Sequence, residues 1–103
     1  MSYPPPPSNI GKHGKSKTPD GKSFSHEIVD EIHIFQKRSK TKLIYLQRIK
    51  LSNGREELRL GYYIIGKKPA MRGRWVWGQY ATFLPVQDFN KIIRMAKKRR
   101  WLK

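Results

Sequence analysis

The sequence predicts an α+β protein in which a four-stranded antiparallel β-sheet is followed by one C-terminal α-helix. Three observations lead to this fold class. Runs rich in β-branched and aromatic residues alternate in polarity with a period of two, as half-buried strands do. Asn53-Gly54 separates two of these runs, and Asn-Gly is the strongest short signal for a β-hairpin. The last apolar run follows Pro85 and repeats with the period of a helix.

The first 23 residues are expected to form a disordered basic arm. Pro4 to Pro7 favours polyproline II, and the stretch after it consists mainly of Gly, Lys, Ser and Thr. Such a segment buries too little apolar surface to offset the entropy lost on ordering. A ligand for a proline-recognition domain is the alternative interpretation of the four prolines. A single folded domain is then expected over residues 24–103.

The four expected strands differ in how clearly they are marked. Residues 27–36 fit a helix or a strand; the alternation of Ile32 and Ile34 favours a strand, although Asp30 interrupts it. The remaining strands are expected over residues 43–51, 58–65 and 74–84.

The period of two divides the aromatic side chains between the two faces of this sheet. Tyr62 and Tyr63 fall on opposite faces, and Trp75 and Trp77 share a face that excludes Tyr80. Because one helix covers only one face of a sheet, a single set of rings could face a ligand.

The helix is predicted from Val86 to roughly Trp101, with Asp88 in its first turn facing the positive end of the helix dipole. Its apolar stripe should cover the sheet and consists of Val86, Phe89, Ile92, Ile93 and Ala96. Met95 and Leu102 fall outside this stripe and form a second, smaller apolar patch.

Charge points to a polyanionic partner. Lys and Arg number 23 against 7 acidic residues, a formal net charge of +16, and such a chain repels itself. A membrane surface is a weaker candidate, because the charge is spread over strands as well as the helix, and no apolar run is long enough to span a bilayer. Without cysteine or a visible signal peptide, the expected location is cytoplasmic or nucleoid-associated, or nuclear in a eukaryote.

Residues 61–84 carry aromatic side chains interleaved with cations. Bases can stack on such rings while the phosphates find positive charge beside them. The expected partner is therefore single-stranded DNA or RNA. The candidate binding residues are Lys42, Arg48, Lys50, Arg59, Tyr63, Lys67, Lys68, Arg72, Arg74, Trp75 and Trp77.

Catalysis and cofactor binding find little support. His13, His26 and His33 lack the spacing and acidic neighbours of a metal site, so neither a cofactor nor a metal is expected. A metal-dependent nuclease would need carboxylates that converge on a cation. Asp30, Glu31 and the Glu56-Glu57 pair could do so across neighbouring strands, which leaves a nuclease subunit as an alternative.

The passage from the last strand into the helix reads Gly-Gln-Tyr-Ala-Thr-Phe-Leu-Pro-Val-Gln-Asp-Phe, over residues 78–89. With the order of four strands and a helix, it resembles the single-stranded-DNA-binding transcriptional coactivator family (positive cofactor four), related in architecture to the Whirly proteins. Asp88 and Phe89 match the acidic and aromatic residues of that family's first helical turn. The resemblance covers about residues 26–101. It implies a homodimer whose curved sheets cradle single-stranded DNA, and the patch of Met95 and Leu102 would suit a dimer formed through helices.

The function expected from these observations is non-catalytic binding of single-stranded nucleic acid, with DNA favoured over RNA. An RNA-binding or ribosome-associated protein is the first alternative, since the same basic surface would serve it. A protein-interaction module with an aromatic binding face is another.

Overall fold

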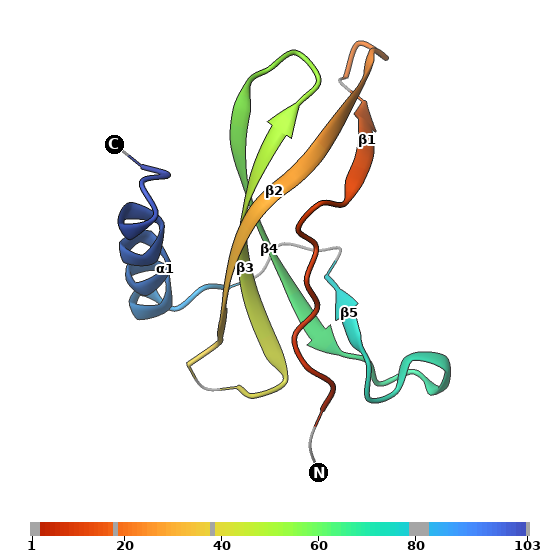
Figure 1. The fold of residues 1–103 in the computed structure, drawn as a ribbon. Helices are drawn as coiled ribbons and strands as arrows, with labels where there is room; N and C mark the ends of the chain where they lie inside the picture. The colour runs from red at the N-terminus through yellow and green to blue at the C-terminus, as the bar shows by residue number, and fades with distance from the viewer. Residues whose placement is uncertain (1–2, 18, 38, 79–82, 103) are drawn as a thin grey trace.

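The computed structural model describes residues 3–17, 19–37, 39–78 and 83–102. Within them the elements are β1 (His13–Lys17), β2 (Ser23–Phe35), β3 (Lys42–Leu51), β4 (Glu56–Ile65), the short 3-10 helix η1 (Pro69–Met71), β5 (Trp75–Trp77) and α1 (Val86–Lys98). The strands form one antiparallel sheet in the order β1-β2-β3-β4-β5, with α1 on one side of it (Figure 1). The predicted α+β class is confirmed, with five strands in place of four.

Strand β2 resolves the ambiguity of residues 27–36 in favour of a strand. It pairs with β3 from Phe35 opposite Leu43 to His26 opposite Leu51, with a bulge between Ile28 and Asp30. A bulge adds one residue to one strand and shifts its alternation. This shift is why Asp30 interrupts the pattern in the sequence, and why Ile28 and Glu31, three residues apart, face the same side.

The turn between β3 and β4 is the hairpin that Asn53-Gly54 predicts. Gly54 has a φ of 87°, in the left-handed region where a residue without Cβ is least strained. The amide of Leu51 donates to the carbonyl of Arg55 at 2.8 Å and closes the turn. The local sequence therefore sets the register of β3 and β4.

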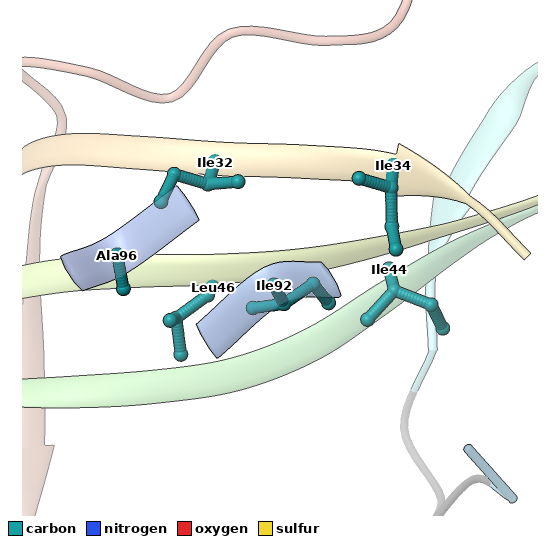
Figure 2. Packing of buried hydrophobic residues seen from close by; sticks show 6 residues of the cluster. All are labelled: Ile32, Ile34, Ile44, Leu46, Ile92 and Ala96. Carbon is teal, nitrogen blue, oxygen red and sulfur yellow. The ribbon is translucent and has the colours of Figure 1, made fainter. Parts of the chain in front are cut away.

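One face of the sheet packs against α1. Its core contains Ile32 and Ile34 of β2, Ile44 and Leu46 of β3, and Ile92 and Ala96 of α1 (Figure 2). The inward residues of each strand alternate, as half-buried strands require.

The helix lies on this face with a rotation that the sequence did not predict. Ile92 and Ala96 are buried as expected, but Val86 is 75% exposed and Phe89 47% exposed. Met95 and Leu102, predicted to form a separate patch, instead pack against the core. The reason is that the buried stripe is centred on Asp88, Ile92 and Ala96. The Asp88 carboxylate accepts a hydrogen bond from the amide of Lys37 at 3.0 Å, which fixes the helix start beside the β2–β3 loop.

The opposite face is covered in part by the N-terminal segment, residues 3–12, which runs past β4 and β5 (Figure 1). Five consecutive residues of β3, Leu43 to Gln47, are buried, so this strand is covered on both faces. This arrangement differs from the disordered arm expected over residues 1–23, and residues 13–17 form strand β1. The physical reason is that the prolines offer carbonyl groups to aromatic donors on the sheet.

Strand β5 is shorter than the fourth strand predicted over residues 74–84. It comprises Trp75–Trp77, and Phe83 and Leu84 lead into α1 without strand pairing. Residues 79–82, with the prediction for Tyr80, lie outside the described residues. In the described part of the chain, no helix is long and apolar enough to cross a membrane.

Candidate nucleic-acid interface

The face of the sheet opposite α1 carries a group of rings, called here the aromatic face: His33, Phe35, Tyr45, Tyr63, Trp75 and Trp77. Tyr63 lies edge-on between its neighbours, with ring centroids 5.0 Å from Tyr45 and 4.9 Å from Trp77. The ring centroids of Trp75 and Phe35 lie 6.3 Å apart. The predicted sharing of one face by Trp75 and Trp77, and the separation of Tyr62 from Tyr63, are both found.

The indole ring of Trp77 lies close to Gly61 of the neighbouring strand. A Cβ at position 61 would overlap the indole ring, so only glycine leaves room for it. On the same side of β4, the Arg59 guanidinium lies 5.3 Å from the centre of the Trp77 ring. Such a contact between a cation and an aromatic face is favourable and orients the guanidinium.

A chain of hydrogen bonds connects Arg59, through Gln47, to the buried carboxylate of Glu31. Its Nε donates to the side-chain oxygen of Gln47 at 2.8 Å, and the Gln47 amide donates to the Glu31 carboxylate at 3.1 Å. Glu31 is buried and also accepts from the backbone amide of Asn9 at 2.8 Å. Burying a carboxylate is costly unless donors surround it, and these contacts supply them. Arg59 is thus positioned by its partners rather than left free in solvent.

A hollow of about 330 Å³ opens between the N-terminal segment and the centre of the sheet. It is lined by Asn9, Lys12, His13, Gly14, His26, Ile28, Gln47, Arg59, Tyr63 and Trp77. Within the residues that the structure describes, no carboxylate lines this hollow, which combines cationic and aromatic side chains. Its volume lies at the lower end of the range for small-molecule sites, about 300–1,000 Å³, so it suits one small ring system.

His26 stands at the wall of the hollow with its ring over Gly14. Burial lowers the pKa of His26 below its ordinary value, and the nearby charges of Arg59 and His13 lower it further. Burial and, to a lesser extent, the positive charge of the site thus both favour the neutral form of the imidazole. An anion beside the imidazole would raise the pKa of His26.

The N-terminal segment closes the other end of the aromatic face. The indole Nε1 of Trp75 donates to the carbonyl of Pro4 at 2.7 Å, and the hydroxyl of Tyr45 donates to the carbonyl of Pro7 at 2.6 Å. Burial, with Glu31 and Tyr63 nearby, raises the pKa of Tyr45, so its hydroxyl stays a donor. The Tyr63 hydroxyl donates to the side chain of Asn9 at 3.1 Å.

The sequence-predicted binding residues do not form one surface. Arg59, Tyr63, Trp75 and Trp77 share the aromatic face. Lys42, Arg48 and Lys50 alternate onto the helix side of β3. There the Lys42 ammonium lies 5.0 Å from the Tyr62 ring, and Arg48 pairs with Glu56 at 2.9 Å. They are thus separated from the rings because side chains one residue apart on a strand face opposite sides.

The four remaining cations, Lys67, Lys68, Arg72 and Arg74, belong to the connection between β4 and β5. All four are exposed, and in the described part of the chain no ion pair joins them to a carboxylate. The connection is folded back by η1 and by a bridge between Gly66 and Arg72, beside Trp75. These cations therefore lie next to one end of the aromatic face.

Sequence reasoning missed several residues of the hollow, chiefly Asn9, Lys12, His26 and Gln47. Lys12 was assigned to a free arm, and His26 was considered only as a metal ligand. Gln47 carried a usable signal, because a single amide inside the apolar run of residues 43–49 must find buried partners.

The carboxylates considered for a nuclease are each paired with other groups. Asp30 contacts Arg99 at 3.0 Å, and Glu57 contacts Arg55 at 3.7 Å. Hydrogen bonds from Arg48 lower the pKa of Glu56. Among the residues that the structure describes, no group of three or more His, Cys, Asp or Glu side chains could hold a metal ion.

Comparison with known proteins gives no match. No protein-family model, no curated protein and no solved structure resembles this chain closely enough to be matched to it.

Proposed function

We propose that this protein binds single-stranded DNA non-catalytically, with the hollow beside Trp77 as the central contact. The observation that carries the proposal is the contact between the Arg59 guanidinium and the Trp77 ring at 5.3 Å, at the wall of a hollow free of carboxylates in the described residues. A base can stack on the exposed part of the indole or on the guanidinium plane, while the free guanidinium nitrogens face phosphate.

The overall charge supports the same ligand. A net charge of +16 on 103 residues attracts a polyanion over a long range. Single strands expose bases for stacking, whereas a duplex keeps its bases paired and stacked inside. The hollow accepts a ring rather than a helical rod, which favours the single strand.

The test is a titration of a labelled dT oligonucleotide by fluorescence anisotropy across a NaCl series. Arg59→Gln should weaken binding and flatten the salt dependence by about 0.7 in the slope of log K against log salt, the share of one phosphate contact in a single strand. Arg55→Gln is the matched control, because it removes the same charge from the exposed hairpin, where Arg55 is 72% exposed. It should change affinity much less.

Trp77→Ala should weaken binding by the loss of one stacked ring, about 1–3 kcal/mol, while the far-UV circular dichroism spectrum keeps its shape. Equal affinity for duplex and single strand, or equal effects of Arg59→Gln and Arg55→Gln, would contradict the proposal. Tighter binding of the matched RNA oligonucleotide would mean that the ligand is single-stranded RNA. That ligand is the second candidate, because the same contacts serve both sugars.

A further inference from the structure

The aromatic face extends beyond the hollow, and its far end is occupied by the chain itself. We propose that residues 3–7, the proline strap, cover a second base-stacking subsite at Trp75, beside the exposed ring of Phe35, and that a longer single strand takes over this subsite by displacing the strap. The inference rests on the proposed function and extends it, because it sets the length of strand that the protein binds.

The strap lies on this subsite through contacts that leave its outer side in solvent. Trp75 donates to the Pro4 carbonyl at 2.7 Å, and the Tyr3 ring meets the Trp75 ring edge-on at 6.2 Å. Tyr3 is 40% exposed, and Pro4 and Pro5 are also exposed. A polyproline II segment has no internal hydrogen bonds, so its carbonyls are available to aromatic donors in this way.

The chain is anchored at Pro7, whose carbonyl accepts from Tyr45, and more firmly just beyond the strap, at Asn9. Asn9 is 6% exposed and bonds to Glu31 through both its backbone amide and its side chain. Asn9, Lys12, His13 and Gly14 line the hollow. The part beyond Pro7 therefore completes the first site, while the strap before it can leave without dismantling that site.

The subsite has what a nucleotide needs once the strap is gone. Trp75 and Trp77 lie two residues apart on one strand face, about 7 Å along β5, a separation that one extended nucleotide spans. The exposed cations of the β4–β5 connection, including Arg74 and Arg72, lie beside Trp75. These cations can bind the phosphates of the nucleotides that extend from the hollow towards Trp75.

Charge favours displacement of the strap by an oligonucleotide. Residues 3–11 contain no Lys, Arg, Asp or Glu, so the strap gains nothing from the cations around the subsite. A polyanion gains from every one of them. The strap thus acts as a neutral competitor that a long oligonucleotide displaces and a short one leaves in place.

The experiment replaces Pro4, Pro5, Pro6 and Pro7 by glycine in the full chain. This change keeps the length and the net charge but removes the preformed polyproline conformation, which weakens the strap. Pro19→Gly, in the exposed β1–β2 turn, is the control. Binding is measured with dT oligonucleotides of about four and about twelve nucleotides, within the range of site sizes known for single-strand binders.

The glycine variant should bind the longer oligonucleotide about fivefold more tightly, because the more flexible glycine segment loses more conformational entropy on ordering and competes less well for the subsite. Affinity for the shorter oligonucleotide should stay unchanged. In wild type, the longer oligonucleotide alone should shift the Trp75 indole N–H resonance away from its position in the free protein, because its bond to Pro4 is broken.

An unchanged ratio of long to short affinities in the glycine variant, or a Trp75 resonance that the long oligonucleotide does not move, overturns the inference while leaving the hollow as a binding site. Absence of binding by wild type and variant at low salt is the distinct result that defeats the proposed function, and the inference with it.

Discussion

At the scale of single residues, the hollow depends on side chains whose positions are set by their neighbours. Gly61 leaves space for the Trp77 ring, and Gln47 connects buried Glu31 to Arg59. Gly61 has no side chain, and the amide oxygen and nitrogen of Gln47 are bonded to Arg59 and Glu31. Gly61 positions Trp77 and Gln47 positions Arg59. A change at either would therefore move a binding side chain without removing it.

His26 provides a test that depends on pH. Its pKa in the free protein is lowered by burial and by Arg59 and His13, so the unfolded chain binds more protons as the pH falls below about 6.5. The free protein should therefore lose stability as the pH falls through this range. A bound phosphate favours the charged imidazole and should raise the pKa, so binding takes up protons and strengthens as the pH falls.

The measurement is an NMR titration of His26 with and without a dT oligonucleotide, whose thymines do not titrate in this range. Each unit by which the bound pKa exceeds the free pKa corresponds to about tenfold tighter binding at a pH below both values. His26→Asn should remove the part of the pH dependence that this imidazole contributes. An imidazole whose titration is unaffected by the oligonucleotide would place the phosphates elsewhere.

At the scale of elements, α1 shows how a tertiary contact selects among helix faces. Its apolar residues extend around more than one face. The bond from the Lys37 amide to Asp88 and the packing of Ile92 on β2 and β3 choose the face that is buried. Phe89 and Val86 are left partly or largely exposed as a consequence.

This rotation can be checked with two substitutions that the sequence pattern treats alike. Ile92→Ala should lower the free energy of unfolding by about 2–4 kcal/mol, because Ile92 is 1% exposed and its removal leaves a cavity. Val86→Ala should change it by less than about 0.5 kcal/mol, as surface substitutions do. Urea denaturation followed by circular dichroism gives both values. Equal losses would mean that the helix buries the stripe predicted from the sequence.

At the scale of the whole molecule, charge acts against folding and in favour of binding. The net charge is +16. The ion pairs Arg48–Glu56, Arg55–Glu57 and Arg99–Asp30 are open to solvent by a third or more of each side chain, and pairs in contact with water contribute little. Self-repulsion among the remaining cations should therefore dominate the salt response of the fold.

Raising NaCl from about 0.02 M to about 0.3 M should increase the thermal midpoint by a few degrees, since screening reduces this repulsion. The same change should weaken oligonucleotide binding. Differential scanning calorimetry and anisotropy on one protein stock measure the two effects. A midpoint that falls with salt would show that the ion pairs outweigh the repulsion. The homodimer stays a prediction, and Met95 and Leu102, expected to form its interface, pack within their own chain.

The sequence by itself determined the fold class and much of the local detail. The alternation of polarity defined the central strands, Asn53-Gly54 set the β3–β4 register, and Pro85 marked the start of the helix. It also placed Trp75 and Trp77 on one face of their strand and Tyr62 and Tyr63 on opposite faces of theirs, while the strand registers of the structure bring Trp75, Trp77, Tyr63 and Arg59 to one side of the sheet. These features follow from local periodicity and turn chemistry, which the chain carries in neighbouring residues.

Tertiary structure alone decided what covers each face. The placement of residues 3–12 on the aromatic face depends on bonds between Pro4 and Trp75, and between Asn9 and Glu31, which are far apart in the chain. No local pattern encodes such partners, and the composition of the segment suggests disorder. The same segment, held by these long-range contacts, forms one wall of the hollow. The physical reason is that periodicity and turn chemistry act between residues that are close in the chain, whereas a binding site gathers residues from several distant segments.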